Sequence, residues 1–382
     1  MDERTNRTIA AYIDGLMEGS TAEAPLWNLE KIRSGRPNKW NYIDGCMIKA
    51  ILAMHEITGE SRYLEFADRF MSGFVTEDGT IRTYDPEEQN LDMICPGTNL
   101  ITLYERTGKE KYRKAADCLR RGLDEMPRTH EGSFWHKKIY PWQVWLDGLY
   151  MAQPFYMTYE TKYDGMKGCT DSFGQFVRVR KYMRDEATGL YYHGYDESRS
   201  MYWADPQTGC SPSFWLRAIG WFACALVETA DCMDETLYYE RRTLQSMLRE
   251  LTEALLPWQG ADGMFSQVVN YPDEPGNYPE TSGSALITYA LLKGVRTGML
   301  PDSYEAPAKK AFGGITARYL KTGTDENGRP KLSLGGICLV AGLGGKDHRD
   351  GTRAYYYSEP VVEDEAKGTA PYILAYTELL RR

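Results

Sequence analysis

The chain has few of the residues that metal and cofactor sites need. Only five of its 382 residues are histidines, and none forms the His-x-x-x-His or Glu-x-x-His pattern of a metal site. Its eight cysteines include no Cys-x-x-Cys pair, which excludes the common zinc-finger and redox motifs. A Walker loop, a dinucleotide-binding fingerprint and a Gly-x-Ser-x-Gly elbow are also missing. The sequence motifs therefore give no indication of a metal site or a nucleotide-binding site.

Long apolar runs and clusters of positive charge are missing as well. The absence of an apolar span of about 20 residues argues against a membrane protein. With 54 acidic and 45 basic residues the net charge is −9, and no basic stripe points to nucleic acid. Because residues 1–4 run directly into a polar amphipathic stretch, we expect no signal peptide and a cytoplasmic protein without disulfides. The oligomeric state is left open.

Aromatic residues, by contrast, are abundant. The chain contains 28 tyrosines and 9 tryptophans, which is more than packing requires. Flat rings that stack on sugar faces explain such a surplus, and an amphipathic lining for another polar ligand is the alternative.

A weak internal repeat predicts the fold. The segment HEITG at residues 55–59 recurs 49 residues later as YERTG at 104–108, and each copy ends as a helix closed by glycine does. Helix–turn–helix units of this length build solenoids and closed toroids. Inner helices are predicted near 44–58, 92–107, 146–160, 213–231 and 282–297, and outer helices near 61–74, 110–126, 170–184, 236–256 and 303–320.

The two ends of the chain supply the remaining pair. A helix over 5–18 can pack on a C-terminal helix over 368–381 and close the ring. We therefore predict an all-α fold, an (α/α)6 toroid of six helical hairpins, in a single domain over residues 1–382. Two aromatic, glycine-containing stretches, 189–196 and 263–269, are predicted to form short β-hairpins over one mouth of the ring.

Asp147 is the first candidate for chemistry, in the segment Trp-Leu-Asp-Gly at 145–148. Since the segment opens a helix, the carboxylate could simply cap that helix. The aromatic surroundings, including Trp145, would instead raise the carboxyl pKa towards the value that a general acid needs. Asp92 is expected at the same mouth of the ring, either as a second active-site carboxylate or as another cap. For Asp44, packing or capping is the better interpretation.

A second cluster lies in the segment 214–221. Arg217 and Trp221 are four residues apart on one helix face, and Trp215 precedes them. A buried arginine needs an anion, so either a substrate carboxylate or an acidic residue of the protein is its partner. His136 and His193 could bind sugar hydroxyls or serve as structural donors.

Together these elements resemble the unsaturated rhamnogalacturonyl hydrolases, glycoside hydrolase family 105. The resemblance rests on residues 145–151, on His193 in its aromatic loop, on Trp215-x-Arg217-Ala-x-Gly-Trp221, and on YSEPVV at 357–362 followed by Lys-Gly at 367–368. It extends from about residue 40 to the C-terminus and implies an (α/α)6 barrel without a metal or cofactor. It also implies a small oligosaccharide substrate with a 4,5-unsaturated uronic acid at its non-reducing end.

The reaction implied by this resemblance is hydration of the C4=C5 double bond, after which the hemiketal opens and releases the remaining sugar. The resemblance makes Asp147 the general acid and base and Asp92 a second active-site carboxylate. It implies that the other pocket residues are Tyr42, His136, Trp145, His193, Trp215, Arg217 and Trp221, with Arg217 the expected partner of the uronate carboxylate.

Other functions are compatible with the same residues. Asp92 and Asp147 could serve an inverting glycosidase that acts on saturated sugars, and related enzymes act on unsaturated glucuronyl units. A sugar epimerase would rely on paired histidines, of which the chain is short. A toroidal binding protein is the non-enzymatic alternative.

Overall fold

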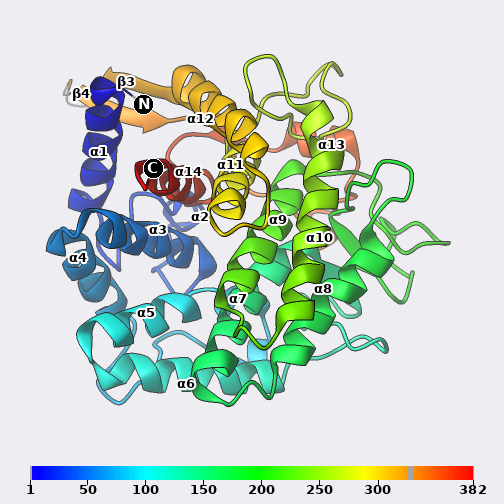
Figure 1. Ribbon diagram of the computed structural model, residues 1–382, viewed down its shortest axis with the longest axis horizontal. Helices are drawn as coiled ribbons and strands as arrows, with labels where there is room; N and C mark the ends of the chain where they lie inside the picture. The colour runs from blue at the N-terminus through cyan, green and yellow to red at the C-terminus, as the bar shows by residue number, and fades with distance from the viewer. Residues whose placement is uncertain (1, 325–327, 329, 382) are drawn as a thin grey trace.

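The computed structural model describes residues 2–324, 328 and 330–381. Six inner helices alternate with outer helices along the chain (Figure 1). The inner helices are α3 (Tyr42–Thr58), α5 (Gly97–Thr107), α7 (Leu146–Tyr163), α9 (Leu216–Cys232), α11 (Thr281–Arg296) and α14 (Ala366–Leu380). The outer helices are α4 (Ser61–Ser72), α6 (Glu110–Asp124), α8 (Cys169–Met183), α10 (Tyr238–Leu255), α12 (Glu305–Tyr319) and α1 (Glu3–Glu18).

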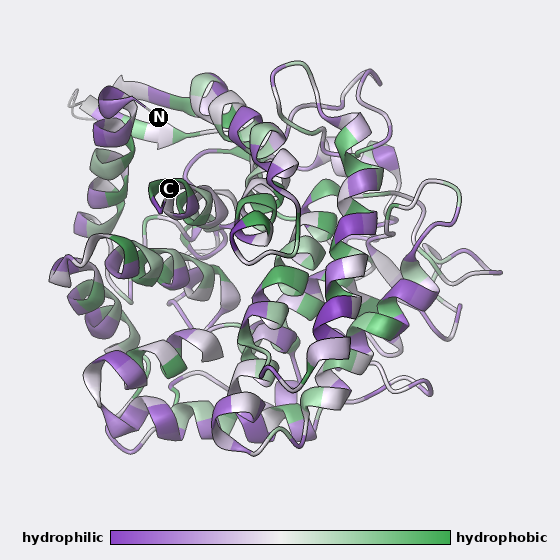
Figure 2. Cartoon of the chain, in the orientation of Figure 1, coloured by the Kyte–Doolittle hydropathy of each residue, from purple (hydrophilic) through white to green (hydrophobic). Residues whose placement is uncertain are grey.

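The inner helices form a closed ring. Each contacts the next in the order α3, α5, α7, α9, α11, α14, and α14 returns to α3. Helices α7, α9, α11 and α14 are buried along most of their length, whereas the outer helices bury one face only. Figure 2 shows this difference as the largely purple outer helices α6 and α10 beside greener inner ones. The predicted (α/α)6 toroid is therefore confirmed.

Helix α1 completes the ring, as predicted. The Tyr12 hydroxyl donates to the Asp364 carboxylate at 2.8 Å, just before α14, and Tyr376 of α14 donates to the carbonyl of Asn6. The repeated glycines also have the predicted role. Gly59 and Gly108 end α3 and α5 in the left-handed conformation, with φ of 71° and 69°, and each donates its N–H back into the helix.

The two stretches predicted as β-hairpins take part in short antiparallel pairs, and their partners come from several segments. Strand β2 (Gly194–Asp196) pairs with β1 (Gln143–Trp145), which lies about 50 residues earlier, and Tyr191 forms a bridge with Arg184. Residues 263–269 form isolated bridges to Trp215 and Pro279. Two further antiparallel pairs join β3 (Leu320–Thr324) to β4 (Pro330–Leu334) and β5 (Ile337–Cys338) to β6 (Val361–Val362). An alternating pattern predicts a strand but does not specify its partner.

Three short helical elements also contribute to the site or its surroundings. They are α2 (Leu29–Ser34), the 3₁₀ turn η2 (Leu91–Met93) and α13 (Arg353–Ser358). Among the described residues no helix combines the length and apolar character needed to cross a bilayer. All eight cysteines are free thiols, and six of them are buried.

Candidate active site

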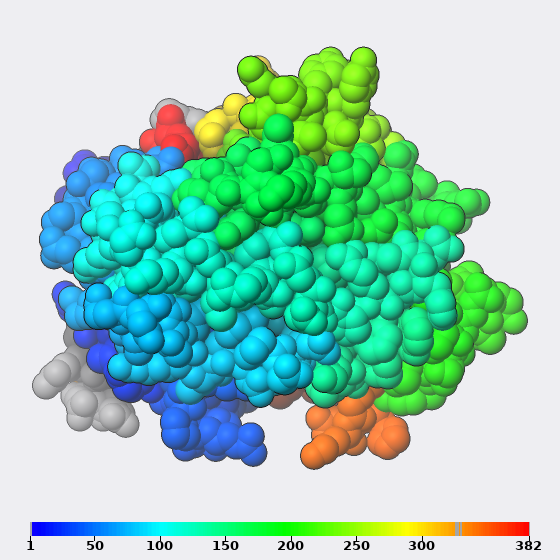
Figure 3. Space-filling model, turned by 90° about the horizontal axis from the view of Figure 1, so that it is seen from below, coloured from blue at the N-terminus to red at the C-terminus, as the bar shows by residue number. Residues whose placement is uncertain are grey.

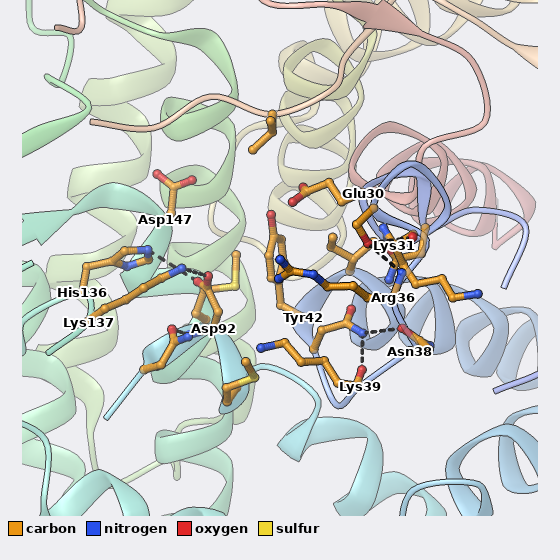
Figure 4. Close-up of a pocket in the computed structure, with 18 of the residues that line it drawn as sticks. Glu30, Lys31, Arg36, Asn38, Lys39, Tyr42, Asp92, His136, Lys137 and Asp147 are labelled. Atoms are coloured by element: carbon orange, nitrogen blue, oxygen red, sulfur yellow. Dashed lines mark hydrogen bonds and ion pairs between the residues drawn. The ribbon is translucent and has the colours of Figure 1, made fainter. Parts of the chain in front are cut away.

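A cavity of about 520 Å³ opens at one mouth of the toroid. Its walls come from the segment 28–43, from η2, from the segment 136–151 at the start of α7, and from the loop 340–349. Of the predicted site residues it brings together Tyr42, Asp92, His136 and Asp147, which are labelled in Figure 4, and Trp145. Four other predicted site residues lie behind the wall and do not line the cavity, namely His193, Trp215, Arg217 and Trp221.

Asp147 faces His193 and is not a helix cap. Helix α7 begins without a side-chain capping bond, and the Asp147 Oδ2 lies 3.2 Å from the His193 Nε2. The pairing of Trp145 with Gly194 brings the two residues together, because it places the His193 carbonyl within 3.0 Å of the Leu146 N–H. Of the two interpretations left open by the sequence, the geometry favours the chemical one.

The protein holds His193 on its far side. The His193 Nδ1 lies 2.7 Å from the hydroxyl of Tyr356, which is fully buried and reaches in from α13. The imidazole also packs on Trp215, with ring centroids 4.7 Å apart, and Tyr356 stacks on the same indole. Trp215 is thus a support for His193. A phenol that donates to Nδ1 leaves the Nε2 proton directed at Asp147.

The pKa of Asp147 differs from the expectation. Burial raises it, but the neighbouring His193 and, more weakly, His136 lower it by more, so that the net shift is downward from 3.8. The expectation of a raised pKa is therefore wrong for the free protein. In the absence of substrate Asp147 is an ionised carboxylate at neutral pH.

Asp92 forms a separate cluster at the same mouth. Its carboxylate lies 2.5 Å from the Lys137 Nζ and 3.5 Å from the His136 Nε2. Asn90, not Asp92, caps the 3₁₀ turn η2. Burial lowers the pKa of His136 to about 4, so this ring is neutral at ordinary pH. Asp92 is accordingly an ion-paired carboxylate that faces the cavity.

Trp145 organises the aromatic wall. Its indole stacks between the His136 and Tyr140 rings, at centroid distances of 4.5 and 4.9 Å, and its edge meets His193. Gly148, three residues after Trp145, allows this packing, since a Cβ there would lie only 3.1 Å from the His136 Nδ1. Glycine in the Trp-x-Asp-Gly motif therefore lets a histidine approach the first turn of α7.

One polar atom of this wall, the His136 Nδ1, is buried without a hydrogen-bond partner among the described residues. The Asp147 Oδ2 and the His193 Nε2 face each other at 3.2 Å, and neither has another partner within the described part of the chain. Folded proteins rarely leave such atoms unsatisfied. The position of His136 and Asp147 on the cavity wall indicates a place where a polar ligand or water binds.

Arg217 has partners within the protein. Its Nε donates to the Ser282 Oγ at 2.7 Å, its Nη2 donates to the Cys338 carbonyl, and the same Nη2 lies 3.8 Å from the Glu280 carboxylate. The arginine is only 1% exposed, so the structure matches the buried ion pair rather than the expected clamp on a substrate. Trp221 is likewise a core residue that packs on Tyr150 of α7.

Tyr42 and Asp44 lie at the start of α3. Tyr42 begins α3 and lines the cavity, and burial raises the pKa of its phenol well above 10, so the hydroxyl stays protonated. Asp44 accepts hydrogen bonds from Trp27, Asn28, Asn38 and Asn41 at 2.7–3.3 Å. It therefore fixes the segment before α3, in agreement with the packing role.

Sequence reasoning missed several residues of the cavity. They are Arg36, Lys39, Lys137 and Arg349 on its walls, and Tyr356 behind it. Lys137 directly follows His136 and could have been found from that position. No group of three or more His, Cys, Asp and Glu with the geometry of a metal site occurs within the described part of the chain.

A helical toroid with carboxylates in an aromatic-walled cavity at one mouth is typical of glycoside hydrolases. The model of Glycosyl Hydrolase Family 88 matches residues 22–382. A family 105 glycoside hydrolase of C. acetobutylicum ATCC 824 is 42% identical, with a TM-score of 0.88 over 97% of this chain and 98% of its own.

Two curated relatives are similar over shorter stretches. Protein Atu3128 of Agrobacterium fabrum is 40% identical over 233 residues, which are 60% of this chain and 98% of that protein. The unsaturated rhamnogalacturonyl hydrolase YesR of Bacillus subtilis is 25% identical over 259 residues, which are 66% of this chain and 70% of that protein. The chain therefore belongs to the glycosyl hydrolase family 88 and family 105 group.

Proposed function

We propose that this glycoside hydrolase releases the 4,5-unsaturated uronic acid from the non-reducing end of oligosaccharides that a polysaccharide lyase has produced. The observation that carries the proposal is the position of Asp147. Its carboxylate lies on the wall of a cavity whose lining has five lysines and arginines against three acidic residues. Such a cavity suits a saccharide with a carboxylate at its end.

The reaction needs one acid that gives up its proton and takes it back. Asp147 protonates C4 of the enol ether, and water adds at C5 as it returns a proton to Asp147. The resulting hemiketal opens by breaking the bond between C5 and the ring oxygen, and the hemiacetal at C1 then releases the leaving sugar. One water is consumed for each bond cleaved, and no other reagent is required.

An anionic substrate also favours protonation of Asp147, which takes from solution the proton that it lacks in the free protein. A uronate carboxylate bound close to Asp147 opposes the charge of the ionised form and excludes water, and both effects raise the pKa of Asp147. A neutral sugar would only exclude water. The ionised state of Asp147 in the free protein therefore favours a uronate over a neutral saturated sugar as the substrate.

For the sugar that follows the uronate we propose rhamnose, as the resemblance to the rhamnogalacturonyl hydrolases and the name of YesR suggest. The substrate is then an unsaturated galacturonyl-rhamnose unit. We also propose that Asp147 is the general acid and base and that Asp92 positions water or sugar through its contact with Lys137.

The loss of the double-bond absorbance tests this function. Wild type should consume lyase-generated disaccharides and leave their saturated counterparts intact. In D₂O the product should carry deuterium at C4, and Asp147→Asn should be inactive while it unfolds at a similar temperature. Cleavage of saturated disaccharides, or full activity of Asp147→Asn, would overturn the proposal.

A further inference from the structure

Two exposed cations stand on the outer wall of the cavity. Arg36 and Lys39 line the cavity from the segment between α2 and α3, and both residues are exposed. Within the part of the chain that the structure describes, no ion pair involves either side chain. Among the other charged residues of the lining, Lys137 pairs with Asp92 at 2.5 Å and Glu30 pairs with Lys367 at 2.6 Å, whereas Lys31 and Arg349 also form no ion pair with a described residue.

The backbone that carries these cations is firmly anchored. The Trp40 N–H donates to the Thr83 Oγ1 at 2.8 Å and its indole donates to the Met93 carbonyl at 2.7 Å. The Asn41 amide donates to the carbonyl of Lys39 at 2.6 Å. Asp44 adds the bonds described above. Surface lysines and arginines on such a fixed segment are preorganised and lose less freedom on binding an anion.

Both side chains extend across the cavity. Figure 4 shows Arg36 and Lys39 reaching from the α2–α3 segment towards the side that carries Asp92 and Asp147. Figure 3 shows this segment (blue) and the loop between β5 and α13 (orange) standing out from the same side of the molecule. That loop carries Arg349, whose Nε donates to the Gly344 carbonyl and whose Nη2 donates to Tyr140. The cations thus surround the outer part of the cavity.

The order of the wall residues sets the direction of the substrate. His136 is buried and the Asp147 side chain is only 14% exposed, whereas Arg36 and Lys39 are exposed, so that the two cations lie nearer to solvent. If the unsaturated uronate contacts Asp147, the leaving saccharide must pass Arg36 and Lys39 on its way to solvent. We infer that Arg36 and Lys39 bind a second acidic group, a carboxylate or a sulfate ester, on the leaving saccharide. This inference rests on the proposed function.

A carboxylate and a sulfate ester offer the same recognition chemistry, that is, oxygen atoms with a negative charge that accept from guanidinium and ammonium groups. The inference makes the enzyme selective for longer acidic fragments over a disaccharide with a neutral leaving sugar. Because the cations are exposed, the selectivity should decrease as salt is added.

The test compares three unsaturated substrates that share the same first two sugars. The first continues into a second uronate, and the second carries a sulfate ester. The third is the first substrate with only its second uronate reduced to the neutral sugar. The proteins are wild type, the double variant Arg36→Gln/Lys39→Gln, and Arg33→Gln, which removes an exposed cation of α2 that does not line the cavity.

The double variant should raise KM for an acidic substrate about tenfold and leave kcat, and KM for the reduced substrate, within about twofold. Arg33→Gln should change neither constant. Whichever acidic substrate responds identifies the group that is bound. Equal changes for acidic and reduced substrates, or no change for any, would overturn the inference even though the double bond is still consumed. Failure of wild type to consume any of the three would instead overturn the proposed function, and this inference with it.

Discussion

The Tyr356 hydroxyl and the His193 Nδ1 are 2.7 Å apart, although 163 residues separate them in the chain. This contact fixes the imidazole that faces Asp147. Tyr356→Phe should therefore lower kcat roughly fivefold, the effect of losing one hydrogen bond of about 1 kcal/mol. KM should change little, because Tyr356 does not line the cavity. Steady-state kinetics on the unsaturated disaccharide measure both constants.

The control for this variant is the neighbouring Tyr357→Phe. The Tyr357 hydroxyl donates to the Glu274 carboxylate at 2.6 Å, away from His193, so its loss should leave kcat unchanged. The two variants should also differ in how kcat depends on pH, since only Tyr356 acts on the group beside Asp147. Identical pH profiles and rates for both would show that Tyr356 has no more than a packing role.

Substrate binding should take up protons. The pKa of Asp147 in the free protein is lowered from 3.8, so the carboxyl is ionised at about pH 5. A bound uronate raises that pKa, and protons then enter the complex. Titration calorimetry with a saturated uronyl disaccharide, in buffers of different ionisation enthalpy, measures this uptake.

The matched protein for this measurement is Asp147→Asn, which has no carboxyl to titrate and should show almost no uptake. In wild type, kcat and kcat/KM should both decline as the pH rises, and the decline of kcat should occur at a higher pH. The reason is that kcat reports the pKa of Asp147 in the complex, whereas kcat/KM reports its pKa in the free protein. Release of protons on binding would contradict the role of Asp147 as the acid.

The fold was largely predictable because its signals are local. Glycines at the ends of α3 and α5 and the 49-residue repeat indicated the hairpins, and the helix boundaries follow the prediction within a few residues. The pairing of short strands was not predictable, since β2 finds its partner β1 through the closure of the toroid. Local pattern indicates the presence of a strand, whereas tertiary structure selects its neighbour.

The site was predictable in part for a related reason. Asp147, Trp145 and His136 lie on one stretch of chain and stay together in space. Arg217 could not be assigned, because Ser282 and Glu280 on another inner helix and its cap are distant in sequence. An inner helix is apolar on nearly every face, so its sequence does not reveal which side faces the cavity.

Gly148→Ala should damage the site more than the fold. The new Cβ would lie 3.0 Å from Leu91 and 3.1 Å from the His136 Nδ1, so that one of them must move. We expect a loss of about 1–3 kcal/mol in unfolding free energy and a decrease in kcat. Gly313→Ala in α12 is the control, because its Cβ would meet nothing within 4 Å. That change should stabilise the protein by about 0.5–1 kcal/mol without affecting kcat.

Stability should also depend on a buried network at the opposite mouth of the toroid. Glu228 of α9 lies 2.8 Å from the Lys49 Nζ and 3.1 Å from the Lys293 Nζ, and it accepts from the Tyr289 hydroxyl. Burial raises the pKa of Glu228, but the two lysines lower it by more, and the net shift is strongly downward from 4.5. Glu228→Gln should therefore destabilise the protein by about 3–5 kcal/mol, because Lys49 loses its buried counter-charge and Lys293 keeps only the more exposed Asp231 at 3.0 Å.

The pH dependence of unfolding distinguishes this network from simple packing. Since the folded pKa of Glu228 lies below its unfolded value, its contribution is fully present above about pH 4.5 and is lost as the pH falls through the folded value. The free energy of unfolding, measured with urea, should accordingly decrease more on acidification for wild type than for Glu228→Gln. Glu253→Gln, which removes an exposed partner of Arg249, should follow wild type at every pH. Equal acid sensitivity of wild type and Glu228→Gln would show that the charge of Glu228 does not stabilise the toroid.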